Sequence, residues 1–290
     1  VEVSRGLQRL FDMSLADAEQ RVADRAWKAL QPLIGSDGEM ILDLSRRLIG
    51  ARRFDRAETL LKKLADSPRN GDAEMESRRI LSREYLTRSQ YQFALAYFRR
   101  ILEAEPADRE ARAGAKVALE GTEDTVGLAK MYAQEISANG AEEAAYSNFL
   151  GLAEKLLQGG EYSLLVSLCD QVTASGAVIP EDFRESLQNY REKALPMHLE
   201  RLVAALGGED EAGRAAARNA LSALGREAAP VLVKALESPS GQVRTMAIGL
   251  LAQLTGGESF GFVAESAPSG QADALNRWNS WLAALGTVGR

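Results

Sequence analysis

A pattern of apolar and basic residues occurs twice near the C-terminal end of the sequence, and the second copy follows the first after about thirty residues. The first copy begins at Leu202 and contains Arg214, and the second begins at Leu232 and contains Arg244. A repeat of this length is typical of stacked helix pairs, because one pair cannot bury its apolar face without a neighbour. We therefore expect an all-α chain, a right-handed α-solenoid of helical hairpins.

The composition favours helices and restricts the kinds of partner that the protein is expected to bind. Hydrophobic residues make up 46% and charged residues 26% of the 290 residues, and only 8 are prolines. The net charge of −6 argues against nucleic acid as a partner, because binding to phosphates needs a basic surface. The most apolar run, Met246 to Ala252, is too short to span a bilayer, so no direct membrane insertion is expected.

Two segments between Glu39 and about Pro106 share one spacing of large and small residues. The shared positions are Leu44, Leu48, Phe54, Ala57, Leu61 and Leu64 in the first segment, and Leu81, Tyr85, Tyr91, Ala94, Phe98 and Ile101 in the second, while Pro68 stands one place earlier in its segment than Pro106 does. We expect Ala94 where two helices cross closely, Phe98 in the groove on the same face, and a helix end at Pro106. The spacing resembles tetratricopeptide repeats, which implies two antiparallel helices in each unit of about 34 residues. Arg78 stands where that family prefers tryptophan.

Further helices are expected on both sides of these segments. Residues 1–34 have the spacing of another helix pair, with Trp27 in its core. Its apolar positions are Leu7, Leu10, Phe11, Leu15, Ala18, Val22, Ala26, Trp27, Leu30 and Leu33. Residues 108–119 and 122–136 predict two helices, the first capped by Asp108. A hairpin is predicted over 141–158 and 163–175, followed by a helix from Pro180 to about Leu195 that ends before Pro196.

The pattern changes at Pro196. The segment from Ala229 to Ala247 resembles a HEAT repeat, although Ser238 replaces the aspartate usual in that family, so we expect Arg244 to pair elsewhere. Trp278 and Trp281 lie on one face of a predicted last helix, either as a plug that closes the final repeat or as an exposed anchor. The predicted domains are therefore 1–195, tetratricopeptide-like, and 196–290, HEAT-like with a capping terminal helix.

The sequence contains few groups suited to catalysis. One histidine, His198, and one cysteine, Cys169, cannot form a zinc site or a Cys/His pair within the chain. The glycine pairs follow predicted helices instead of strands, which is typical of helix ends and not of phosphate-binding loops. We expect no catalytic residue, no metal and no cofactor, and hence no enzyme.

Basic doublets concentrate in the two tetratricopeptide-like segments. The resemblance places eight residues on the inner surface of their first helices: Glu39, Leu42, Arg46, Ile49, Glu76, Arg79, Arg83 and Leu86. Because a guanidinium binds carboxylates through two points and leucines can hold an apolar anchor, an acidic, partly hydrophobic peptide is the expected ligand. The alternative is that these arginines are solvated or paired with nearby acids, for example Glu76 with Arg79 or Arg83.

The function that follows is a scaffold or adaptor that captures a segment of a partner protein on the concave solenoid surface. Two alternatives remain: a permanent structural subunit of a larger bacterial assembly, for example in the cell envelope, and a HEAT-like accessory enzyme such as a chromophore lyase. The bacterial cytoplasm and the periplasm both fit as the compartment, because an export signal upstream of Val1 is compatible with the sequence.

Overall fold

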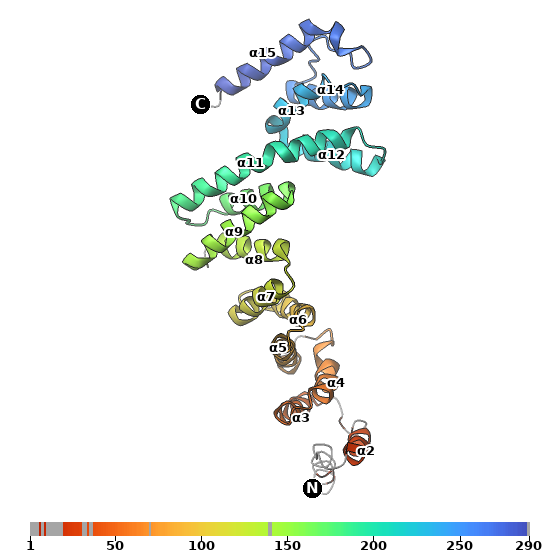
Figure 1. Ribbon diagram of the computed structural model, residues 1–290, viewed down its shortest axis with the longest axis vertical. Coiled ribbons are helices and arrows are strands. Elements are labelled where there is room, and N and C mark those ends of the chain that lie inside the picture. The colour runs from red at the N-terminus through yellow and green to blue at the C-terminus, as the bar shows by residue number, and fades with distance from the viewer. Residues whose placement is uncertain are drawn as a thin grey trace. The chain divides into compact units, whose positions relative to one another are not determined.

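The computed structural model describes residues 20–30, 37–69, 71–138 and 141–288, together with Gly6, Arg9 and Ile34 (Figure 1). Across these residues every regular element is a helix and no strand occurs, so the expected all-α class is confirmed. The chain forms two compact units, Val1–Leu128 and Ala129–Arg290. Within the described ranges, no helix combines the length and the apolar character that a membrane span requires.

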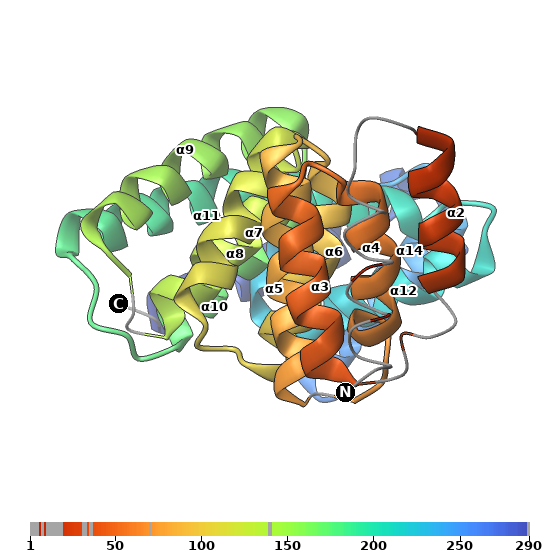
Figure 2. The ribbon, with the colours of Figure 1, turned by 90° about the horizontal axis from the view of Figure 1, so that it is seen from below.

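Unit 1 is built from helical hairpins. Its helices are α2 (Gln20–Leu30), α3 (Gly38–Gly50), α4 (Phe54–Ala65), α5 (Asp72–Thr87), α6 (Tyr91–Ala104) and α7 (Arg109–Gly121), and α8 (Thr125–Ser137) contains the division between the units. Each helix from α3 to α7 packs on the next. The first helices of the hairpins, α3, α5 and α7, also pack on one another, so α3 lies beside both α4 and α5 (Figure 2).

The expected core of the second hairpin is confirmed. Ala94 and Phe98 are buried, and the Phe98 ring packs on α7 at Gly114. A Cβ atom at position 114 would overlap that ring, so the two helices can approach this closely only at a glycine. Trp27 is buried as predicted. The predicted apolar positions Leu7, Leu10, Phe11, Leu15, Ala18 and Leu33 lie outside the described residues.

The same turn joins the two helices of four successive hairpins, from α3–α4 to α9–α10. In each turn one residue adopts the left-handed conformation: Arg52 with φ 59°, Ser89 with φ 55°, Glu123 with φ 56° and Gly160 with φ 76°. The N–H of the following residue donates to the carbonyl oxygen five positions earlier, as when Gln90 donates to Tyr85 at 2.8 Å. This is the Schellman helix ending. Its recurrence shows that the hairpins repeat in backbone geometry as well as in sequence.

Ser89→Gly is expected to raise the free energy of unfolding by about 0.5 to 1 kcal/mol, because a side chain in the left-handed conformation is strained and glycine is not. The N–H of Ser89 donates to Leu86 through the backbone, so that hydrogen bond survives the substitution. The urea midpoint, followed by circular dichroism, measures the change. Ser89→Ala is the control, since alanine keeps the Cβ atom, and an equal gain from alanine would contradict the explanation.

Unit 2 continues with helices only. They are α9 (Glu143–Gly159), α10 (Tyr162–Ala174), α11 (Glu181–Leu206), α12 (Glu211–Leu224), α13 (Ala229–Ala235), α14 (Gly241–Thr255) and α15 (Ala272–Val288), with short 3₁₀ turns at Gly225–Ala228 and Pro268–Gly270. The break near Gly160 and the helix start at Glu181 agree with the predictions, and Asp108 caps α7 as expected by accepting from Ala111 N at 2.9 Å.

One predicted boundary was wrong. The helix α11 does not end at Leu195 but continues through Pro196 to Leu206. Proline removes one helical hydrogen bond, but Ala194 and Leu199 on either side of it are buried, and α11 packs on α10, α12 and α13. This packing outweighs the local preference of proline to end a helix. The predicted domain boundary between residues 195 and 196 lies inside α11, and the two compact units are Val1–Leu128 and Ala129–Arg290.

The two C-terminal repeats use equivalent arginines in the same way. Arg244 donates to the carbonyl oxygens of Ser238 at 2.8 Å and Pro239 at 2.9 Å. Arg214 donates to those of Gly208 at 2.9 Å and Glu209 at 2.7 Å. The expectation that Arg244 pairs elsewhere than with an aspartate at position 238 is therefore confirmed, because its partners are backbone carbonyl groups.

Candidate functional site

A row of ion pairs connects the first helices of unit 1. Arg46 of α3 donates from Nη2 to Oε1 of Glu76 on α5 at 2.9 Å. Arg83 of α5 holds both carboxylate oxygens of Glu110 on α7, from Nε at 2.5 Å and from Nη2 at 2.6 Å. Each arginine therefore joins its own helix to the next first helix. We call these two pairs, together with Arg79 and its acids, the charge ladder.

Arg79 occupies the middle of the charge ladder. Its Nη2 donates to Glu105 at 2.5 Å and to Asp108 at 3.1 Å. The backbone N–H of Ala111 and the guanidinium of Arg79 both stabilise the ionised carboxylate and hold the pKa of Asp108 below its usual value. The hydrogen bond from Arg83 likewise lowers the pKa of Glu110.

The eight residues predicted to line a groove do not all lie at the surface. Glu39 is exposed, and Arg46, Glu76, Arg79 and Arg83 meet in the charge ladder; Ile49 and Leu86 are half-buried. Leu42 is only 3% exposed, so it is a core residue and the expectation that it anchors a ligand was wrong.

The alternative interpretation of the arginines, pairing with nearby acids, describes the structure better. Their recorded ion pairs run between helices, to Glu76, Glu105, Asp108 and Glu110, and not across one turn of α5 from Glu76 to Arg79 or Arg83. Sequence reasoning placed the arginines on one surface but did not identify Glu105, Asp108 and Glu110 as their partners, because the pairing depends on how neighbouring hairpins pack.

The Arg83–Glu110 pair is expected to contribute a coupling energy of about 0.5 to 1 kcal/mol, since both side chains remain in contact with solvent. A double-mutant cycle with Arg83→Met and Glu110→Gln measures it through urea unfolding. Because the pKa of Glu110 is lower in the folded state, the coupling energy is fully present above the unfolded pKa of about 4.3. It is lost as the pH falls below that pKa, because the carboxylate becomes protonated. A cycle of Arg83→Met with Glu120→Gln, an exposed acid on the same helix, should give no coupling. A coupling for Glu110 that persists at pH 2 would contradict the assignment.

The described residues bring together no group of three or more histidine, cysteine, aspartate or glutamate side chains that could hold a metal ion. Cys169 is buried, which raises the pKa of its thiol to about 12 and keeps it protonated near neutral pH. Burial and the charge of Arg201 lower the pKa of His198. The Cys169 thiol is therefore not prepared for nucleophilic attack.

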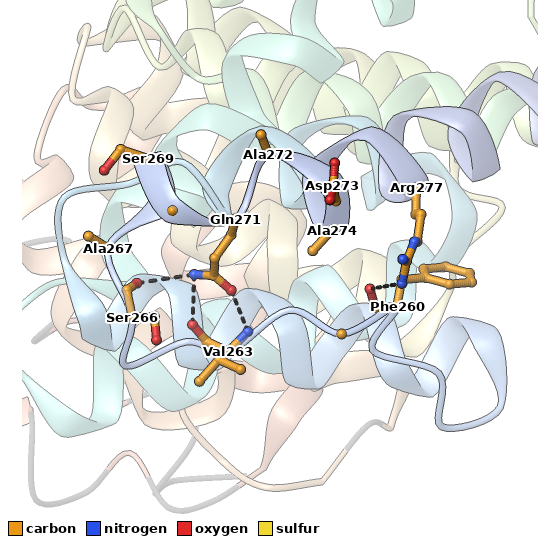
Figure 3. Close-up of a pocket in the computed structure, with 12 residues that line it drawn as sticks. Phe260, Val263, Ser266, Ala267, Ser269, Gln271, Ala272, Asp273, Ala274 and Arg277 are labelled. Carbon is orange, nitrogen blue, oxygen red and sulfur yellow. Dashed lines mark hydrogen bonds between the residues drawn. The ribbon is translucent and has the colours of Figure 1, made fainter.

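A cavity of about 760 Å³ lies in unit 2 between the loop that begins at Phe260 and the first turns of α15 (Figure 3). The amide of Gln271 fixes this loop, because it accepts from Val263 N at 2.6 Å and donates to Val263 O at 2.9 Å. The walls are mostly backbone and small side chains, with the charged groups of Asp273 and Arg277 on one side.

The whole chain was compared with known proteins. No family model, no curated protein and no solved structure matches it.

Proposed function

We propose that this protein is a non-catalytic protein-binding scaffold whose first-helix face in unit 1, formed by α3, α5 and α7, captures a segment of a partner protein. The observation that carries the proposal is the charge ladder. Its ion pairs connect three consecutive first helices while the charged groups remain accessible, with the side chains of Arg46 and Arg83 54% and 50% exposed. A partner segment laid across these helices would meet guanidinium groups at regular intervals.

An exposed ion pair can exchange one partner for another at little cost in free energy. A surface pair contributes less than about 1 kcal/mol, so a carboxylate of the partner can replace Glu76 or Glu110 without a large loss of stability. Arg46 uses Nη2 for its recorded bond, which leaves other N–H groups for a second acceptor. The half-buried Ile49 and Leu86 supply the apolar contact that Leu42 cannot. An acidic segment with an apolar anchor thus remains the proposed ligand.

The proposed architecture is a right-handed solenoid with tetratricopeptide-like repeats followed by HEAT-like repeats. Two observations within the units support it: the Schellman turn that recurs in four hairpins, and the shared carbonyl contacts of Arg214 and Arg244. Repeating hairpins present extended surfaces instead of a deep catalytic pocket, which favours binding as the function.

Co-purification with the charge-reversal variant Arg46→Glu/Arg79→Glu/Arg83→Glu tests the proposal. We expect the partner to be lost from this variant and retained by a control with the exposed residues Lys63, Arg99 and Arg100 changed to glutamate, which carries the same change in net charge. Circular dichroism must show that both variants stay folded. A partner that remains bound to the first variant would overturn the assignment of the first-helix face.

A permanent structural subunit of a larger bacterial assembly is the second candidate. The partly buried Trp281 and Leu282 of α15 favour it, because apolar side chains that keep part of their surface exposed can pack against another subunit. Such a partner would remain bound in high salt and would dissociate when Trp281 and Leu282 are replaced by serine. No feature of the described residues favours the third prediction, an accessory enzyme of the chromophore lyase kind.

A further inference from the structure

The two ion pairs that join first helices in the charge ladder occupy equivalent positions. The acceptors Glu76 and Glu110 each lie thirteen positions before the left-handed residue of their own hairpin turn. The donors Arg46 and Arg83 each lie six positions before it. Each donor bonds to the acceptor on the next first helix. Within one first helix, the two positions are seven residues apart, so their side chains lie on the same side of the helix, about two turns from each other.

The first end of the charge ladder has an acceptor without a donor. Glu39 lies at the acceptor position of α3, thirteen positions before Arg52, and its side chain is exposed. Among the residues that the structure describes, none forms an ion pair with Glu39. The equivalent carboxylates of Glu76 and Glu110 both bind a guanidinium group. The repeat itself therefore shows which chemical group is complementary to Glu39, namely a cation with N–H donors.

The other end of the charge ladder is apolar. The donor position of α7, six positions before Glu123, holds Val117 where α3 and α5 have arginine. Val117 is 47% exposed and lies two turns after Glu110 on the same side of α7. Its side chain can contact an aliphatic group of a partner but cannot pair with an acid. The charge ladder thus begins with an unpaired acid and ends with an exposed apolar side chain.

The spacing of these groups is regular. Each of the helices α3, α5 and α7 contributes one step, from its acceptor position to its donor position, and seven helical residues span about 10 Å. The ion pairs join the end of one step to the start of the next, because Arg46 reaches Glu76 and Arg83 reaches Glu110. An extended peptide advances about 3.3 Å per residue, so about three of its residues match one step.

We propose that the first-helix face selects a partner segment by the order of its side chains: one basic residue, two acidic residues and one apolar residue, about three positions apart. The basic residue pairs with Glu39, the acidic residues bind Arg46 and Arg83, and the apolar residue packs on Val117. Arg83 keeps Nη1 for this contact, since its Nε and Nη2 bind Glu110. The inference rests on the proposed function, in which the arginines bind acids of the partner, and adds the groups at the two ends. A segment with the same charges in another order meets like charges and is rejected.

Two fluorescein-labelled peptides of identical composition test the order. They are titrated with the full chain, and binding is read by fluorescence anisotropy. The ordered peptide is Gly-Arg-Gly-Ser-Glu-Gly-Ser-Glu-Gly-Ser-Leu-Gly, and the permuted peptide is Gly-Glu-Gly-Ser-Arg-Gly-Ser-Leu-Gly-Ser-Glu-Gly. Because the permuted peptide does not match the charge ladder in either direction, we expect the ordered peptide to bind about fivefold more tightly.

Substitutions at the two ends test the individual contacts. Glu39→Arg should weaken binding of the ordered peptide about fivefold, and a peptide with glutamate in place of its arginine should bind this variant more tightly than the unchanged protein. The matched control is Glu103→Arg, an exposed acid of α6 with the same change in charge, which should alter neither affinity. Val117→Ser should weaken binding about threefold, whereas Val178→Ser, at an exposed valine of unit 2, should not.

The outcomes separate this inference from the proposed function. Equal binding of the ordered and permuted peptides, with both lost in Arg46→Glu/Arg83→Glu, would overturn the inference and leave the proposed function standing. Binding of neither peptide would overturn both. An ordered peptide that binds Glu39→Arg as it binds the unchanged protein would show that its basic residue does not contact Glu39, which also overturns the inference. The substituted side chains at positions 39 and 117 are exposed, so both variants are expected to fold, and circular dichroism checks this.

Discussion

Trp278→Ala is expected to lower the free energy of unfolding of unit 2 by about 3 to 5 kcal/mol. The Trp278 side chain is completely buried in the core of unit 2, between the edge-on rings of Phe260 at 4.7 Å and Trp281 at 5.3 Å. Its Nε1 donates to the carbonyl oxygen of Ser259 at 3.2 Å. Alanine leaves a large cavity and removes this hydrogen bond, so that the Ser259 carbonyl group keeps only the one from Phe262 N at 3.0 Å.

The control for this substitution is Trp281→Ala, on the same face of α15. Trp281 is only partly buried, so its loss is expected to cost about 1 to 2 kcal/mol. Urea unfolding monitored by circular dichroism at helix wavelengths gives both values. Equal costs for the two tryptophans would show that Trp278 is not the residue that closes the last repeat.

Arg244→Met is expected to cost about 3 kcal/mol, because it removes a buried guanidinium and keeps its apolar stem. The guanidinium is almost fully buried and donates to three carbonyl oxygens, including that of Ala264 at 2.9 Å in the loop before α15. Methionine cannot donate to any of them, so the buried carbonyl group of Ala264 and the part-buried ones of Ser238 and Pro239 lose this donor. The loop should also become accessible to proteases in the native state.

Arg214→Met provides the comparison within the same protein. Arg214 makes the equivalent pair of carbonyl contacts one repeat earlier but is less buried, and neither carbonyl group is cut off from water. Its replacement should cost less than about 1 kcal/mol. A similar cost for both arginines would mean that burial of the guanidinium is not what makes Arg244 important.

Local sequence patterns predicted most of the secondary structure. The cap at Asp108, the break at Gly160 and the helix start after Pro180 depend on residues within one turn, so they can be found without knowing the fold. The burial of Trp27, Phe98 and Trp278 follows from apolar spacing in the same way. Pro196 was the exception, since contacts of α11 with the helices packed against it decide that the helix continues there.

The candidate site was harder to predict from the sequence. The sequence placed Arg46, Arg79 and Arg83 on one surface. The acids that pair with them lie on the next hairpin or in the connection that leads to it. Only the packing of the hairpins shows which carboxylate each arginine reaches. The ring contacts of Tyr85 with Phe54, Phe93 and Tyr97 were missed altogether. One signal was present: Phe93 directly precedes the buried Ala94 and Leu95 of α6, which turns a large aromatic side chain to the edge of the apolar stripe.

For this protein, the sequence by itself determined the helices, their caps and the residues that fill each hairpin, because periodicity and capping act over a few residues. Tertiary structure alone decided that Leu42 is buried, that the arginines of the first helices are paired, and that Phe93 stays exposed. These features depend on how one hairpin lies against the next. That placement is fixed by the shape and packing of whole helix faces, which no local pattern encodes.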